Sequence, residues 1–358
     1  MKTVLFLLLL IHGLIHGMGF VKDFGLAELT ALSQPISRPM GLLWLLAALL
    51  FLSAGVSLLM NAPAWWMFAL AGILLSQIVI ADSWSDARWG TLANLILILP
   101  VLAAYGQWQF DRQVDQEVKA FETMAVAPVQ PTPLDSLPPV VRRWLGQSGF
   151  SSKLPRQVSI TQHGRMRLKP EGRWMPFSAS QTFRPDHPGF IWRTQVDMMP
   201  GISFLGRDAF LQGQGHMLIK ILGWIPVADA SGPTTDQGTM LRYLGETVWF
   251  PAGALHPAIA WEQIDDTRAR ATITRDGQSA SGLFTFTPEG RFVRFAAKRY
   301  YDRNGSSTLE DWLITVRPDG YRTMNGYTIP ASLDVTWQLT DGDFTWMNLE
   351  IDSLRVVD

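Results

Sequence analysis

The chain has 358 residues, of which 47% are hydrophobic and only 17% charged, and its formal net charge is −1. This length suits two domains, and a net charge near zero argues against a nucleic-acid partner. Cysteine is absent, which excludes a disulfide scaffold, a thiol nucleophile and a cysteine-ligated metal.

The first third of the chain has the composition of a membrane region. Only six of the 30 Lys and Arg residues lie in residues 1–133. A transmembrane helix requires about 20 apolar residues. Apolar runs near this length cover four segments, Val4–Phe20, Gly41–Met60, Ala64–Ala81 and the shorter Thr91–Tyr105. We therefore predict a four-helix transmembrane bundle over residues 1–109, in contact with the lipid bilayer. Its first helix is expected to be retained, because no small-residue cleavage site follows it.

Polar side chains within these predicted spans are candidate functional residues. His12 and His16 lie four residues apart on one face of the first helix, and Asp82 and Asp86 lie at the junction of the third and fourth. Imidazole and carboxylate groups bind metals, so one hypothesis is a metal or proton site in a membrane enzyme or ion-handling protein. The simpler interpretation is hydrogen bonding between helices, because two histidines are too few ligands.

A linker separates the membrane region from the rest of the chain. Phe110–Glu122 is predicted to extend the last span as a helix, and five prolines follow within Val126–Pro139. Proline-rich segments are extended and semi-rigid. We place the linker at residues 110–136 and a β-rich globular domain at residues 137–358.

Alternation of apolar and polar residues dominates from Val158 onwards and predicts strands. The exception is Asp236–Pro251, which has helical periodicity, with Asp236 expected to cap it and Pro251 to end it. A sheet with many strands must curl or close to limit its edges. The predicted fold is a mainly antiparallel β domain, a curled sheet or half-barrel of about a dozen strands around one helix.

The space between such a helix and sheet suits an apolar ligand. Polar and aromatic residues expected at this position are the ligand-binding candidates Asp208, Arg242, Glu246, Trp249 and Arg299. The alternative is structural ion pairing under the helix. Arg before Glu is the less favourable order for an i,i+4 bridge, so we expect Glu246 to pair with another residue, such as Arg299.

Sequence motifs for catalysis are absent. The chain has no Gly-x-Ser-x-Gly elbow, no P-loop and no His-Glu-x-x-His, so we predict no catalytic residue and no cofactor. Three hypotheses follow: a membrane-tethered module that binds a lipid or other apolar ligand, a membrane enzyme or ion-handling protein, and a scaffold that binds a protein partner.

Several segments of the β domain carry a resemblance. They are Trp174-x-Pro-Phe177, Met198-Met-Pro-Gly201, Gln237-Gly-Thr-x-x-Arg-Tyr-Leu244 and Ala297-x-Arg-Tyr-Tyr301. They resemble an uncharacterised family of bacterial multi-span membrane proteins with a C-terminal all-β domain. The resemblance implies the bacterial inner membrane, with the C-terminal domain on the extracytoplasmic side, and no catalytic residues. Many strands curling over a helix also resemble the lipoprotein-localisation carrier proteins of the bacterial envelope, which implies an apolar ligand.

Overall fold

The computed structural model describes residues 2–150, 154–303 and 306–357. The chain forms two compact units, one made of Met1–Asp111 with Leu222–Trp224 and the other of Arg112–Ile221 with Ile225–Asp358. Each unit is described by itself below.

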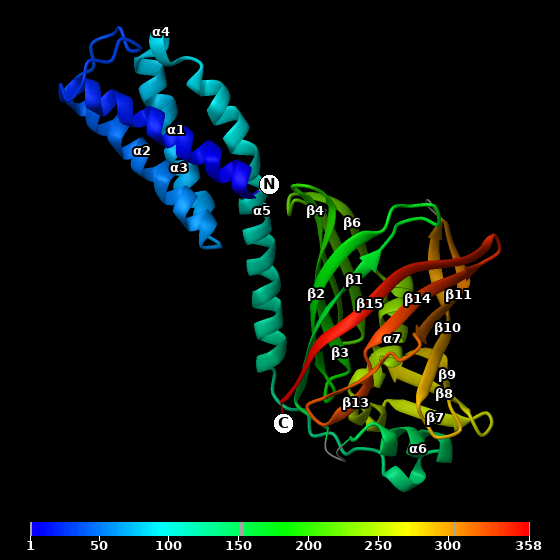
Figure 1. Cartoon of the computed structure of the whole chain (residues 1–358). Helices are drawn as coiled ribbons and strands as arrows, with labels where there is room; N and C mark the ends of the chain where they lie inside the picture. The colour runs from blue at the N-terminus through cyan, green and yellow to red at the C-terminus, as the bar shows by residue number, and fades with distance from the viewer. Residues whose placement is uncertain (1, 151–153, 304–305, 358) are drawn as a thin grey trace. The chain divides into compact units, whose positions relative to one another are not determined.

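The first unit is helical, as predicted. Its helices are α1 (Lys2–Asp23), α2 (Arg38–Leu59), α3 (Trp65–Asp82), the short α4 (Trp84–Ala87) and α5 (Gly90–Thr123), which continues into the second unit (Figure 1). In the described part of the chain, four of them are long and apolar enough to cross a membrane.

Helix α5 contains two of the predicted elements. The fourth predicted span and the predicted extension at Phe110–Glu122 are one continuous helix that runs through Pro100. Proline is tolerated in membrane helices because neighbouring groups satisfy the freed carbonyl.

Small residues allow the helices of the first unit to pack closely. A Cβ on Gly13 would lie 3.1 Å from the Cβ of Phe51, and one on Gly19 would overlap the ring of Trp44. Large apolar side chains such as Leu14 and Leu99 stay 60% and 68% exposed on the outer faces. Small residues inside and large apolar residues outside are typical of membrane helices.

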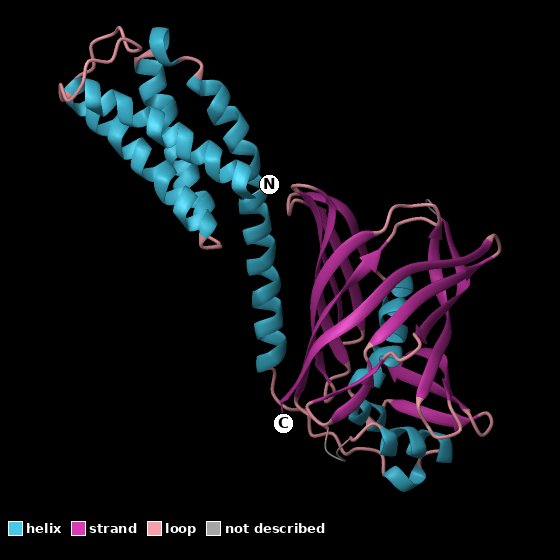
Figure 2. Ribbon diagram, viewed as in Figure 1, coloured by secondary structure: helices cyan, strands magenta, loops and turns pink. Residues whose placement is uncertain are grey.

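The second unit is built on one curled antiparallel sheet (Figure 2). Within the described residues the sheet has 13 strands in the order β6-β5-β4-β3-β2-β1-β15-β14-β11-β10-β9-β8-β7. Its strands are β1 (Gln157–Met166), β2 (Met175–Arg184), β3 (Gly189–Met199), β4 (Ile202–Leu211), β5 (Gln214–Ile221), β6 (Ile225–Ser231), β7 (Ile259–Gln263), β8 (Arg268–Arg275), β9 (Gln278–Phe286), β10 (Phe292–Arg303), β11 (Ser306–Val316), β14 (Ser332–Leu339) and β15 (Gly342–Val357). A separate two-stranded sheet pairs β12 (Tyr321–Met324) with β13 (Tyr327–Pro330).

Helix α7 (Pro233–Glu246) lies in the concave side of this sheet, which confirms the predicted half-barrel around one helix (Figure 1). In chain order α7 stands between β6 and β7, the two edge strands. The same helix therefore connects both edges of the half-barrel. Helix α6 (Pro139–Gln147) and the short 3₁₀ helix η1 (Leu134–Ser136) precede the sheet.

The predicted boundaries of the central helix were wrong at both ends. The helix begins at Pro233, and after Glu246 the chain continues as two 3₁₀ helices, η2 (Thr247–Trp249) and η3 (Pro251–Leu255). Asp236 is not its cap, since the Asp236 Oδ1 accepts a hydrogen bond of 2.6 Å from the Gly215 amide of β5. Strands β6 and β13 were also missed, because Ile225–Ser231 and Tyr327–Pro330 are short and contain proline.

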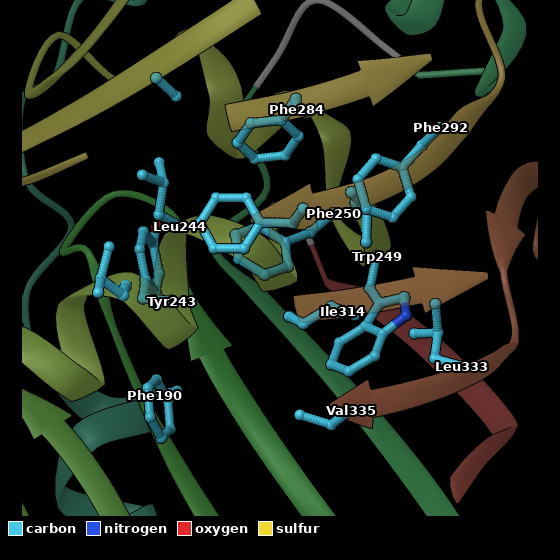
Figure 3. Close-up of a cluster of buried hydrophobic side chains, with 14 of the residues drawn as sticks. Phe190, Tyr243, Leu244, Trp249, Phe250, Phe284, Phe292, Ile314, Leu333 and Val335 are labelled. Carbon is cyan, nitrogen blue, oxygen red and sulfur yellow. The ribbon is translucent and has the colours of Figure 1, made fainter. Parts of the chain in front are cut away.

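Aromatic side chains fill the space between the end of α7 and the sheet (Figure 3). Tyr243 of α7, Trp249 of η2 and Phe250, which follows η2, lie in one buried cluster with Phe190 of β3 and Phe284 of β9. Complete burial of a side chain of this size contributes about 1.5–3 kcal/mol. This aromatic core fixes α7 against the sheet.

Arg184, at the end of β2, ties the last turn of α5 to the sheet. It is fully buried and binds Asp186 through two nitrogens, at 2.7 Å and 2.6 Å. Its Nη1 also donates to the Phe121 and Met124 carbonyls at 2.9 Å and 3.2 Å. The last carbonyls of a helix have no hydrogen-bond donor within it. Arg184 supplies a donor to the Phe121 carbonyl of α5.

We expect Arg184→Leu to destabilise the second unit by about 3–5 kcal/mol, because Asp186 is left buried without its charge partner. The measurement is urea unfolding of the full chain in detergent, followed by tryptophan fluorescence. Arg294→Leu, at an exposed position on β10, is the control and should cost under about 0.5 kcal/mol. Equal midpoints for the two variants would contradict the structural role of Arg184.

Candidate functional site

The inner faces of β2, β3 and β4 carry four rows of residues in register, because side chains on one face of a sheet repeat every two residues. The first row is Phe183, Phe190 and Phe210, and the second is Gln181, Trp192 and Asp208. The third row is Ala179, Thr194 and Gly206, and the fourth is Phe177, Val196 and Phe204. The first row belongs to the aromatic core, and the polar second row faces α7.

Arg242 of α7 binds the second row. Its Nη1 donates to the Asp208 Oδ2 at 2.8 Å, and its Nε donates to the Glu246 Oε1 at 2.7 Å. Its guanidinium lies over Trp192, 4.6 Å from the ring centroid. Gln181 donates to the second oxygen of Glu246 at 2.7 Å. One arginine and two carboxylates are thus joined in a buried network.

The network joins one cation to two carboxylates, and burial and charge shift the pKa of Arg242 and of Glu246. Burial raises the pKa of Glu246, although the positive charge of Arg242 opposes this effect. Burial acts to lower the pKa of Arg242, but the two carboxylates outweigh it and the pKa is raised. Arg242 therefore stays charged and forms ion pairs with Asp208 and Glu246.

The expected pair of Glu246 with Arg299 was wrong, since Glu246 binds Arg242. The i,i+4 order is unfavourable only for an isolated pair, and here Asp208 and Gln181 fix both partners. The side chains of Arg242 and Glu246 are only 15% and 7% exposed. Trp249 lies apart from them in the aromatic core, where its Nε1 donates to the Pro330 carbonyl at 2.9 Å.

Arg299 of β10 is a half-buried cation that lies against α7 at Gly238, four residues before Arg242. Its guanidinium lies 4.8 Å from the Trp312 ring centroid and 6.0 Å from that of Trp337. A Cβ on Gly238 of α7 would lie 3.0 Å from the Arg299 Nε, so the missing side chain makes room for the guanidinium. Burial lowers the pKa of Arg299 to about 10, which leaves it charged at neutral pH.

Among the residues that the structure describes, the Arg299 guanidinium has no hydrogen bond and no ion pair. Trp312 beneath it is 2% exposed, and its Nε1 also lacks an acceptor within the described chain. Two donors without acceptors therefore lie together next to the network.

The structure brings together three of the five predicted ligand-binding residues, Asp208, Arg242 and Glu246, with Arg299 nearby. Sequence analysis missed Gln181 and Trp192. The available signal was Gln181 itself, a polar residue at an inward position between Ala179 and Phe183.

The two histidines of α1 take part in a buried hydrogen-bond network. His12 Nε2 lies 3.0 Å from the Asn94 Oδ1, and Ser76 donates to the same oxygen at 3.1 Å. His16 Nδ1 lies 2.9 Å from the His12 carbonyl. These contacts join α1, α3 and α5.

The two carboxylates of the metal hypothesis lie elsewhere. Asp82 is exposed at the end of α3, and Asp86 accepts hydrogen bonds from the Ser33 hydroxyl at 2.7 Å and the Gln34 amide at 2.9 Å. No group of three or more His, Asp and Glu residues that could hold a metal occurs in the described ranges.

A cavity of about 360 Å³ lies beside the end of α5, lined by residues that include Phe121, Met124 and Leu211. Its charged and histidine lining residues have partners, and the Arg275 Nε lies 3.5 Å from the Asp276 Oδ2. Glu117 pairs with Arg207 at 2.9 Å, and His187 Nε2 lies 2.9 Å from the Ala125 carbonyl. The cavity thus lacks the unpaired cation found at Arg299.

Comparison with known proteins gives a family but no activity. The model of a family of unknown function, DUF6544, matches residues 127–349. No curated protein matches this chain.

Several solved structures match this chain at low similarity. A LolA superfamily protein from Nitrosomonas europaea has 9% identity, covers 61% of this chain and 92% of its own, and gives a TM-score of 0.34. A putative outer membrane lipoprotein-sorting protein domain from Vibrio parahaemolyticus has 11% identity, covers 63% and 93%, and gives 0.30. A DUF1329 family protein from Desulfovibrio piger has 9% identity, covers 63% and 93%, and gives 0.30. Similarity this low carries no information about what this chain binds.

We expect Arg242→Met to destabilise the domain by about 3–5 kcal/mol, because Asp208 and Glu246 are then buried without a cation. Replacing all three residues, as Arg242→Met, Asp208→Leu and Glu246→Leu, should recover most of this loss, since no charge remains to be desolvated. Thermal unfolding of the full-length variants, followed by circular dichroism, measures both effects. A triple variant less stable than the single one would contradict the role of Arg242 as the cation that compensates the two buried carboxylates.

Proposed function

We propose that this chain, which belongs to the DUF6544 family of unknown function, is a membrane-anchored binding module for a lipid or another apolar ligand. The four long apolar helices anchor it in the bacterial inner membrane, and the half-barrel lies on the extracytoplasmic side. The ligand lies on the inner face of the half-barrel, over the third and fourth rows of β2, β3 and β4.

One observation carries the proposal: the inner face continues past α7 as apolar surface with free space at its base. The third row is made of small residues, and a Cβ on Gly206 would meet only the Thr194 side chain within 4 Å. A Cβ on Gly215, at the level of the first row, would instead overlap Thr235 and Thr239 of α7. Helix α7 therefore fills the first level and leaves space at the third.

The residues beyond this space suit an apolar ligand. The fourth row is apolar, and Met166, Met175 and Met198 lie further along β1, β2 and β3. Phe204 and Met198 are only half-buried. Flexible methionine side chains adapt to ligands of different shape, and apolar surface with a few polar groups is typical of ligand sites.

The test uses the full chain in nanodiscs and a 16-carbon fatty acid that carries a photoreactive diazirine on its chain. We expect crosslinked peptides from the inner face of β2–β4, and we expect Gly206→Leu to reduce this labelling several-fold by filling the space. Ser178→Leu, which places the same side chain at an exposed position on β2, is the matched control. Labelling confined to the membrane helices would overturn the proposal.

A second candidate function, an enzyme or ion-handling role in the membrane helices, draws support from the buried network of His12, Asn94 and Ser76. Metal analysis of the detergent-purified protein tests its metal-site form. The wild type should carry metal that the variant His12→Ala/His16→Ala lacks, and equal metal content would overturn this form.

A further inference from the structure

We infer that the ligand of the half-barrel is an amphiphile with one anionic oxygen group, a carboxylate or a phosphate, and that Arg299 and Trp312 bind this group. The inference rests on the proposed function and adds the chemical class of the ligand.

The first argument is the distribution of partners among the cations of the inner face. Arg242 has Asp208 and Glu246 within 2.8 Å, so its donors and its charge are used inside the protein. For Arg299 no carboxylate of the described residues lies within ion-pair distance. The Arg299 donors are therefore open to an anion from outside, whereas the donors of Arg242 are already occupied.

The second argument is that Arg299 is held in place before any ligand arrives. Its guanidinium stacks over Trp312 at 4.8 Å, and Gly238 of α7 leaves room for it on the other side. Stacking on an aromatic face suits a guanidinium, which is planar and weakly hydrated. A donor that is already ordered loses little conformational entropy when it binds an anion.

The third argument is the second donor. The Trp312 Nε1 is buried without an acceptor within the described chain, and leaving such a donor unpaired costs about 1–3 kcal/mol. Because the guanidinium lies over the indole ring, we propose that one anionic group accepts hydrogen bonds from both side chains. A carboxylate or phosphate has several acceptor oxygens, and hydrogen bonds to ionised groups are the strong ones.

The position of Arg299 also fits an amphiphile. Its neighbouring charges are Asp208 of the second row and Arg242 and Glu246 of α7, which bind that row. The small residues of the third row come directly next. An anionic group at Arg299 thus leaves the apolar chain over the third and fourth rows.

The experiment compares three probes with the same 16-carbon diazirine chain and different ends: a carboxylate, a phosphate monoester and a neutral alcohol. Labelling of the inner face is divided by labelling of the membrane helices in the same sample, which corrects for partition into the nanodisc. In the wild type we expect the carboxylate or the phosphate to exceed the alcohol by about tenfold. Which of the two is preferred identifies a fatty acid or a phosphorylated lipid.

Variants test whether Arg299 and Trp312 cause the preference for the anionic probes over the alcohol. Arg299→Gln should label equally with all three probes, and Trp312→Phe, which keeps the ring and removes the donor, should lose part of the preference. Arg294→Gln, the same change at an exposed position of β10, should behave as the wild type. If Arg299→Gln does not fold, Arg299→Lys, which keeps the charge without the planar donors, should weaken the preference, and an unchanged preference would overturn the inference.

The outcomes separate the inference from the proposed function. Equal labelling of the wild-type inner face by all three probes overturns the anion site and leaves apolar binding intact. Absence of inner-face labelling by every probe overturns both.

Discussion

The β domain depends on one helix packed into the concave side of its sheet. A 13-stranded sheet within the described residues has two edges, β6 and β7, and α7 is the segment that connects them. Exposed edges invite pairing with other chains, and a curled sheet needs something to bury its apolar inner face. Helix α7 meets the second need with Tyr243, Leu244 and the aromatic side chains that follow, and its place in the chain joins the two edges.

The same packing buries charged side chains, which costs desolvation free energy. Arg242 and Glu246 lie on a helix that is otherwise buried, so each must find partners on the sheet or in its own helix. Asp208 and Gln181 supply them. Because the network is complete around Arg242, it holds α7 in register with β2 and β4. Arg299, which lies against α7 at Gly238, has no direct bond to this network, and that difference distinguishes a structural arginine from a candidate ligand-binding one.

Both units use the same physical rule for buried polar groups. Arg184 is fully buried and gives its donors to Asp186 and to the last carbonyls of α5. His12, Asn94 and Ser76 satisfy one another between apolar helices. In each case a polar group that has left water is hydrogen-bonded. Trp312 Nε1 is one of several buried atoms in the described chain without a partner, which include Tyr243 Oη and Trp346 Nε1. It differs from these in lying beneath Arg299, a cation that also lacks a direct partner among the described residues.

The sequence by itself determined the four apolar helices, the antiparallel β domain and the single helix within it, because periodicity and apolar length depend on neighbours along the chain. It also pointed to Asp208, Arg242 and Glu246, since charged residues next to an apolar helix require partners. Only the tertiary structure decided which partners they have. Glu246 binds Arg242 rather than Arg299, and Gln181 completes the network from a strand 65 residues away. Contacts between distant segments depend on strand register and on the angle at which α7 crosses the sheet, and neither is encoded in any local pattern of residues.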